Sequence, residues 1–256
     1  KYCYFFGNPS SSYNDLSTTE WLEFFKELGS LSVMDVCLGG GEPFLRSDLV
    51  DLIDGIIRSG MRFSLVSNGV LVTDSMAVFL GQTRRLNNVQ VSIDSAIPFE
   101  HDYCRGQGSW EGAVSGIRIL QNRGVNVTAR VTIHRHNYRN MKKTAEFILE
   151  HLQLPYFGTN AAGYIGRCRS NAPDLLLTVR ERLHVMSELL ELKRIYGARI
   201  RANAGPLADA QMWRSMESAK REGASAFQNG GRLSGCGCVQ SRISINSDGS
   251  VSPCNQ

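Results

Sequence analysis

The chain has 256 residues, of which 42% are hydrophobic and 20% charged, and its formal net charge is +4. This composition excludes a disordered chain and is typical of a globular protein with one sizeable core. Lysines and arginines are scattered among acids, which argues against a nucleic-acid partner. No apolar run approaches the roughly 18 residues of a membrane span, and the first residues do not resemble a signal peptide. We therefore expect no membrane partner and a cytoplasmic location.

Short apolar, β-branched segments alternate with longer segments whose apolar residues recur at helical spacing. In chain order, the pattern predicts a helix near 18–29, a strand at 33–38, a helix at 46–60, a strand at 62–67, a helix at 73–82, a strand at 89–93, a helix at 109–123, a strand at 125–133, a helix at 139–153, a strand at 155–159 and a helix at 176–196. Repeated βα units predict a parallel sheet with helices outside it. The first helix needs a strand before it, so we expect at least six strands and a first strand that precedes Lys1.

The sequence changes in character after about residue 197. Glycine, serine and asparagine dominate there, and "SRISINSDGSVSPC" predicts a two-stranded hairpin with a turn at Asp248 and Gly249. We therefore expect a core domain at 1–197 and the start of a small second domain at 198–256.

Distinctive motifs follow the expected strands at the end where sites form in parallel βα sheets. "GGGEP" occupies 39–43, "SN" 67–68 and "SIDS" 92–95. Glycines let backbone N–H groups approach a ligand closely, and an acid beside them suits a ligand amino group rather than a phosphate. The absence of "GxGxxG" and "GK[ST]" disfavours a Rossmann or P-loop site.

Seven cysteines in a chain too large to need a disulfide scaffold indicate metal or redox chemistry. Cys3 stands alone near the start, whereas Cys236, Cys238 and Cys254 gather near the end. Thiolates beside a hairpin are also typical of structural zinc, so zinc remains open for the second group. Cys37 lies in an apolar strand and is expected in the core.

With "KYC" at 1–3, "GGEP" at 40–43 and these terminal cysteines, the chain resembles radical S-adenosylmethionine (SAM) enzymes that carry a SPASM or twitch extension. The resemblance implies an α/β fold: a partial (β/α)6 TIM-like barrel of parallel strands followed by a small C-terminal β-hairpin iron–sulfur domain. It implies that the chain is trimmed at both ends and that Cys3 is the third ligand of a [4Fe–4S] cluster, with two cluster cysteines before Lys1.

The same resemblance implies one or more auxiliary iron–sulfur clusters in the second domain. Cys236, Cys238 and Cys254 are the candidate ligands, and the choice between Cys236 and Cys238 stays open.

The resemblance also implies a SAM site, with the "GGEP" motif at the SAM amino group and Arg130 as a candidate for its carboxylate. The implied cofactor-binding residues are Tyr2, Gly40, Gly41, Glu42, Pro43, Ser67, Asn68, Ser92, Asp94 and Arg130. Structural alternatives stay open: Ser92 and Asp94 can be ordinary strand-end polar groups, and Arg130 can form an ion pair. Arg105, in a loop before a helix, orients that loop or contacts substrate.

The implied activity is reductive cleavage of SAM to a 5′-deoxyadenosyl radical, followed by oxidative modification of a precursor peptide or protein through a cross-link, thioether or epimerisation. An electron donor such as flavodoxin or ferredoxin is then a further partner. The first alternative is a sulfatase-maturase-like enzyme or an oxidase of tetrapyrrole or quinone cofactor biosynthesis. The alternative from another class is a zinc-stabilised α/β binding protein without catalysis.

Overall fold

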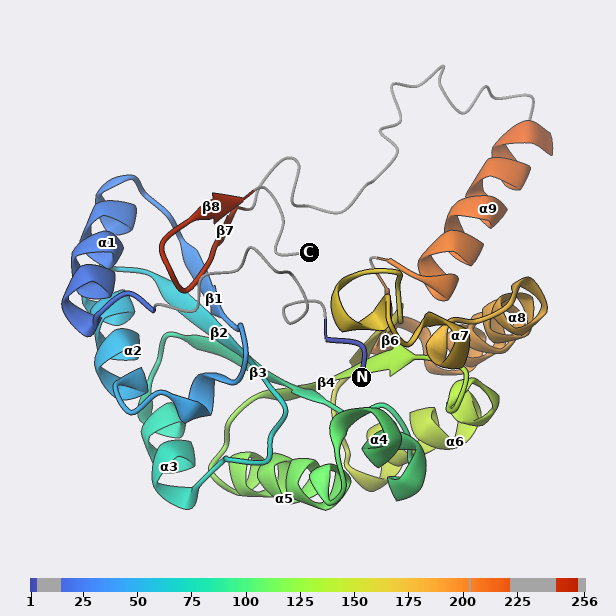
Figure 1. Ribbon diagram of the computed structural model, residues 1–256, viewed down its shortest axis with the longest axis horizontal. Helices are drawn as coiled ribbons and strands as arrows, with labels where there is room; N and C mark the ends of the chain where they lie inside the picture. Colours follow the sequence, from blue (N-terminus) through green and yellow to red (C-terminus); the bar gives the residue numbers. More distant parts are fainter. Residues whose placement is uncertain (4–14, 203, 222–242, 253–256) are drawn as a thin grey trace.

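The main sheet of the protein is wholly parallel and follows the chain order. The computed structural model describes residues 1–3, 15–202, 204–221 and 243–252. The sheet consists of β1 (Asp35–Leu38), β2 (Arg62–Ser67), β3 (Leu86–Ser92), β4 (Val127–Ile133), β5 (Phe157–Ala161) and β6 (Ile200–Arg201). It curves as an open barrel, with its helices on the outer side (Figure 1). The predicted α/β fold with a parallel partial barrel is confirmed.

Helices lie between successive strands of the main sheet, and α1 precedes β1 while α9 follows β6. They are α1 (Thr18–Ser30), α2 (Leu49–Arg58), α3 (Asp74–Gln82), α4 (Pro98–Arg105), α5 (Ser109–Asn122), α6 (Met141–Glu146), α7 (Ala172–Leu175), α8 (Val179–Tyr196) and α9 (Pro206–Arg221). Short turns add η1 (Pro43–Leu45), η2 (Tyr138–Asn140), η4 (Gly166–Cys168), η5 (Gly197–Arg199) and a π-helical turn, η3 (Phe147–His151), that continues α6. No helix within the described ranges is long and apolar enough to cross a membrane.

Successive side chains of the central strands point alternately to the core beneath the helices and to the inner face of the barrel. Val89 and Val91 of β3 are fully buried and belong to the core that also contains Ile117 of α5. Ser92 and Arg130 are half-buried on the opposite face and stand side by side in the β3–β4 register. Since successive strand residues point to opposite faces, the inner face carries the polar residues of these strands.

β1 differs from the central strands because, among the strands that the structure describes, only β2 pairs with it. Asp35 and Cys37 of β1 are exposed. The expectation that Cys37 lies in the core is therefore wrong: Cys37 pairs with Ser64 in the register and lies on the sheet face away from the helices. An apolar sequence does not ensure burial in a strand that has a described neighbour on one side alone.

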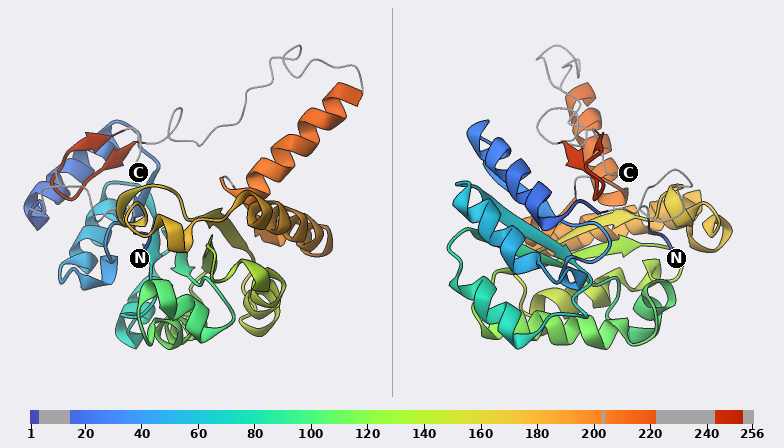
Figure 2. Two further views of the ribbon diagram at one scale, coloured as in Figure 1. Left: turned by 45° about the vertical axis from the view of Figure 1, so that its right-hand side comes forward. Right: turned by 60° about the vertical axis from the view of Figure 1, so that its left-hand side comes forward.

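The C-terminal part adds two elements that the sequence did not predict. β6 pairs with β5, so the main sheet continues past the boundary expected at residue 197. α9 begins at Pro206, buries Leu207 and Ala210, and otherwise extends away from the barrel (Figure 2). β6 is too short to give a pattern, whereas proline at a first helical position was a usable signal for α9.

The predicted hairpin is present as β7 (Ser244–Ile245) and β8 (Val251–Ser252), which pair antiparallel. Gly249 has φ of +81° in the turn, a conformation that favours glycine. The carbonyl of Ser247 accepts a hydrogen bond of 2.7 Å from the backbone N–H of Leu16, which places the hairpin beside the start of α1 (Figures 1 and 2).

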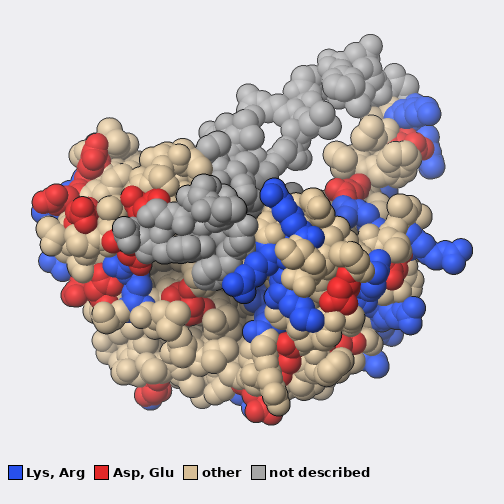
Figure 3. Space-filling model, viewed as in Figure 1, with Lys and Arg blue, Asp and Glu red and all other residues tan. Residues whose placement is uncertain are grey.

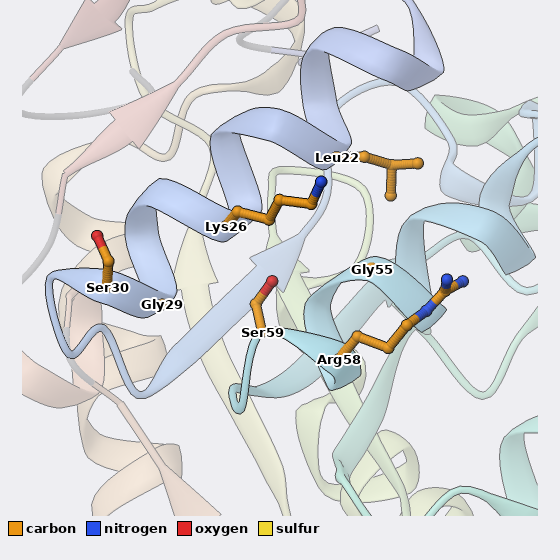
Figure 4. Close-up of a pocket in the computed structure, with 7 residues that line it drawn as sticks. All are labelled: Leu22, Lys26, Gly29, Ser30, Gly55, Arg58 and Ser59. Atoms are coloured by element: carbon orange, nitrogen blue, oxygen red, sulfur yellow. The ribbon is translucent and has the colours of Figure 1, made fainter.

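A surface cavity of about 390 Å³ lies between α1 and α2, with Lys26 and Arg58 among its lining residues (Figure 4). The helices approach closely here, since a Cβ on Gly29 would lie 2.5 Å from the carbonyl oxygen of Ser59. Arg58 lies in the last turn of α2, where its charge stabilises the helix dipole. The cavity lies at the amino ends of the strands, opposite the loops that carry the site motifs.

Candidate active site

The loop after β1 forms an open backbone turn. Gly40 has φ of +102°, a conformation that L-residues rarely adopt. A Cβ placed on Gly40 or Gly41 would meet no atom within 4 Å. This turn therefore offers unobstructed backbone next to the acid that follows it, as a cradle for a small ligand requires.

Glu42 connects the loops after β1 and β2. Its carboxylate accepts hydrogen bonds from Ser67 Oγ at 2.8 Å, from the backbone N–H of Asn68 at 2.7 Å and from that of Phe44 at 3.3 Å. Pro43 begins η1, for which Glu42 is the N-cap. A carboxylate has about four acceptor positions, so these three bonds leave room for one further donor.

Arg130 supplies an unneutralised cation on the inner face. Burial lowers the pKa of its guanidinium, and no carboxylate in the described part of the chain pairs with it. The alternative of a structural ion pair for Arg130 is therefore not found among these residues. Gly158 makes room for the side chain, since a Cβ there would lie 3.0 Å from Arg130 Nη1. An open glycine turn, an acid with spare acceptor capacity and a cation without a counter-ion fit the amino acid part of SAM.

Asp94 is the most connected acid at this edge of the sheet. Its side chain is fully buried and accepts from Arg105 Nε at 2.6 Å, from Arg105 Nη2 at 3.2 Å and from the backbone N–H of Thr132 at 2.9 Å. The hydroxyl of Tyr2 also donates to it. Burial alone would raise the pKa of Asp94, but the charge and hydrogen bonds of Arg105 outweigh burial, and the pKa is lowered. Asp94 thus faces protein donors in this structure, and its role as a SAM contact stays a prediction.

The segment with Cys3 lies at the same edge of the barrel. The carbonyl of Cys3 accepts a bond of 2.9 Å from the backbone N–H of Arg167, in the loop after β5. Tyr2, one residue earlier, reaches Asp94 after β3. Its hydroxyl stays protonated because burial raises its pKa well above 10.0. The structure therefore brings the predicted cluster cysteine to the carboxyl ends of the strands.

Two buried histidines flank this network. His101 Nδ1 accepts from the backbone N–H of Asp94 at 3.1 Å, and His134 Nδ1 accepts from the backbone N–H of His136 at 3.2 Å. Burial lowers the pKa of each imidazole from 6.5 to about 4. Both are therefore neutral near pH 7 and serve as acceptors for backbone amides.

The predicted site residues divide into three groups. Glu42, Ser67 and Asn68 contact one another, Ser92 lies beside Arg130 in the sheet register, and Tyr2 contacts Asp94. Cys236, Cys238 and Cys254 lie outside the described residues. Within the described part, no three His, Cys, Asp or Glu side chains come together as a metal site.

Sequence reasoning left the role of one residue of the site undecided and missed another. It left the role of Arg105 open, and the structure shows a two-point ion pair with Asp94. It did not notice Gly158, although a glycine inside a strand often marks the close approach of another group.

Solved structures share the fold. SuiB from Streptococcus suis matches with a TM-score of 0.71 and 11% identity over 96% of this chain and 55% of its own. The structure of anSMEcpe with bound AdoMet and a peptide matches with a TM-score of 0.70 and 16% identity over 99% and 69% of the two chains. The fold is therefore that of the partial barrels found in such proteins.

The Radical SAM superfamily profile matches residues 1–148, more than half of the chain. The chain therefore belongs to the radical SAM superfamily.

Curated relatives include the PqqA peptide cyclase of Ruegeria pomeroyi, which is 28% identical over 152 residues, or 58% of this chain and 40% of the relative. The Fe-coproporphyrin III synthase of Methanosarcina barkeri is 31% identical over 167 residues, or 65% and 41% of the two chains. The chain spans less than half the length of these relatives.

Proposed function

We propose that the protein is a radical SAM enzyme that reductively cleaves SAM and oxidatively modifies a peptide. The observation that carries the proposal is that the carboxyl side of the barrel has both an open glycine turn beside Glu42 and Arg130, which pairs with no carboxylate of the described residues. The name of the R. pomeroyi relative, PqqA peptide cyclase, supports a peptide substrate. SuiB, solved with its precursor peptide SuiA, shares the fold with a TM-score of 0.74.

Each end of the SAM amino acid has a proposed partner. The remaining acceptor position of Glu42 would bind the ammonium group, and the backbone at Gly40 and Gly41 would lie alongside it. Arg130, assisted by Ser92, would bind the carboxylate. Charge-assisted bonds at both ends fix orientation as well as affinity.

The donor set for the cluster includes Cys3, whose thiolate suits iron. A [4Fe–4S] cluster, when bound, supplies the electron that cleaves SAM. We also propose that Cys254 and either Cys236 or Cys238 hold an auxiliary cluster in a second domain, predicted at 198–256. The β7–β8 hairpin supports this proposal because it places Ser244 opposite Ser252, and these are the described strand residues nearest in sequence to the candidate cysteines on either side.

A protein such as flavodoxin or ferredoxin is the proposed electron donor. The loop at 163–171 carries Arg167 and Arg169 and no acid, both arginines are exposed, and Arg167 bonds to the Cys3 backbone. Lys and Arg side chains gather over the middle of this face (Figure 3). An acidic donor protein would be attracted to this face. The rate at which it reduces the cluster should therefore fall as the salt concentration rises.

The test is anaerobic purification followed by metal analysis and incubation with SAM and a reductant. We expect about four irons per chain for one cluster and about eight for two, together with 5′-deoxyadenosine. Zinc without iron would instead support the non-catalytic binding protein.

A cofactor-pathway oxidase is the second candidate, because the M. barkeri relative is named an Fe-coproporphyrin III synthase. Parallel incubations with a candidate tetrapyrrole precursor, followed by mass spectrometry for Fe-coproporphyrin III, and with a candidate precursor peptide, followed by mass spectrometry for a modified peptide, separate the two. Conversion of the tetrapyrrole alone would replace the peptide assignment.

A further inference from the structure

One buried carboxylate joins three segments that are far apart in the sequence. We propose that Asp94 is a positioning residue, which holds the Tyr2–Cys3 segment in a fixed place on the carboxyl edge of the barrel. That Asp94 holds the Tyr2–Cys3 segment is argued from hydrogen bonds alone. The effect of this positioning on a bound cluster rests on the proposed function.

The first step is that Asp94 has no surface with which to act directly. Its side chain has 0% exposure, and its oxygens accept from Tyr2, from both sides of the Arg105 fork and from Thr132. A group enclosed in this way can influence a bound cofactor only through the groups that it holds. Tyr2 is the one among them that belongs to the cysteine-bearing segment.

The second step is that the backbone of Asp94 is itself fixed. Its N–H donates to His101 Nδ1, and its carbonyl accepts from Asn137 Nδ2 at 2.8 Å. Asn137 Nδ2 also donates to the carbonyl of Thr132 at 3.0 Å. The ends of β3 and β4 are therefore tied together around the carboxylate, and a side chain held by such a network has few alternative positions.

The third step concerns the other contacts of the segment. Asn171 Nδ2 donates to the carbonyl of Lys1 at 3.1 Å, and the backbone N–H of Arg167 donates to that of Cys3. Both contacts come from the loop between β5 and α7 and use only the backbone of the segment, so they are indifferent to which residue occupies each position. Side-chain contacts add to these: Lys1 Nζ lies 3.7 Å from Asp174 and 3.5 Å from the centre of the Tyr103 ring, and the Tyr2 and His134 rings lie 5.9 Å apart. The Tyr2 hydroxyl on Asp94 is the side-chain hydrogen bond to a fully buried partner, and it lies one residue from Cys3.

The test uses Asp94→Asn and Tyr2→Phe in the complete protein. Asp102→Asn is the matched control. Asp102 lies in α4, the helix that also carries Arg105, and it accepts from the backbone N–H groups of Gly108 and Trp110 but does not contact Tyr2. Hydrogen exchange of the peptide that covers 163–171 reports the Arg167 bond to Cys3. We expect exchange about tenfold faster in both test variants and unchanged exchange in the control.

The second readout is the electron paramagnetic resonance spectrum of the reduced cluster with and without SAM. We expect unchanged iron per chain in Tyr2→Phe, a smaller SAM-induced spectral change and about tenfold weaker SAM binding. Since Asp94→Asn leaves Arg105 without its counter-ion and can fail to fold, Tyr2→Phe decides the question in that event.

Unchanged exchange in Tyr2→Phe, or equally fast exchange in Asp102→Asn, would overturn the positioning role. Faster exchange with a normal SAM response would overturn its consequence for the cluster. If exchange rises as expected but the parent protein binds no iron, the proposed function fails and the fixing of the segment stands.

Discussion

His101 should make the folded protein sensitive to mild acid. Burial lowers the pKa of its imidazole from 6.5 to about 4. Between these values the unfolded chain binds more protons than the folded chain, so the free energy of unfolding falls as the pH drops below 6.5. At about 1.4 kcal/mol per pKa unit, acidification from pH 7.5 to 5 removes about 2 kcal/mol of stability through this side chain.

His101→Asn tests this reasoning, because its side-chain oxygen can replace Nδ1 as the acceptor for the Asp94 N–H without titrating. Urea unfolding, followed by circular dichroism at pH 7.5 and pH 5, should show a loss smaller by about 2 kcal/mol in this variant than in the parent. The remaining loss includes His134, whose pKa is also lowered to about 4. Equal losses in His101→Asn and the parent would refute a buried, neutral His101.

Three further predictions concern the cofactor sites. Glu42→Gln keeps an acceptor for Ser67 but removes the charge that faces a SAM ammonium group, so calorimetry should show about tenfold weaker SAM binding with iron per chain unchanged. Gly158→Ala should weaken SAM binding several-fold, because its Cβ would lie 3.0 Å from Arg130 Nη1; Gly163→Ala, whose Cβ would meet nothing closer than 3.9 Å, is the control and should bind normally. Cys254→Ala should reduce iron per chain without abolishing 5′-deoxyadenosine formation, and loss of SAM cleavage with the first cluster still loaded would contradict the auxiliary role.

Local patterns were sufficient for most of the fold. The alternation of short β-branched segments with helical segments predicted β1 to β5 and the helices between them, because side-chain periodicity directly reflects which face of each element is buried. The same patterns missed α4, whose short sequence "PFEHDYCR" is mostly polar. They also missed β6, which is identified only by its pairing with β5.

At the site, the glycine turn also shows which features the local sequence predicts and which depend on contacts between distant segments. The sequence placed three glycines and Glu42 directly after a strand, which is enough to predict an open backbone beside an acid. It could not show that Glu42 already accepts bonds from Ser67 and Asn68, because these residues belong to the next βα unit. The spare capacity of the carboxylate follows only from counting these bonds.

The sequence alone determined that the protein is built from parallel βα units with a glycine–acid turn and a cysteine near its start. Only the tertiary structure decided that Asp94 is enclosed by Tyr2 and Arg105, that Cys37 is exposed, and that Gly158 makes room for Arg130. Hydrophobic periodicity indicates which face of its own helix or strand each residue occupies. A contact such as Tyr2 with Asp94 joins positions 92 residues apart, and it depends on how every intervening element packs.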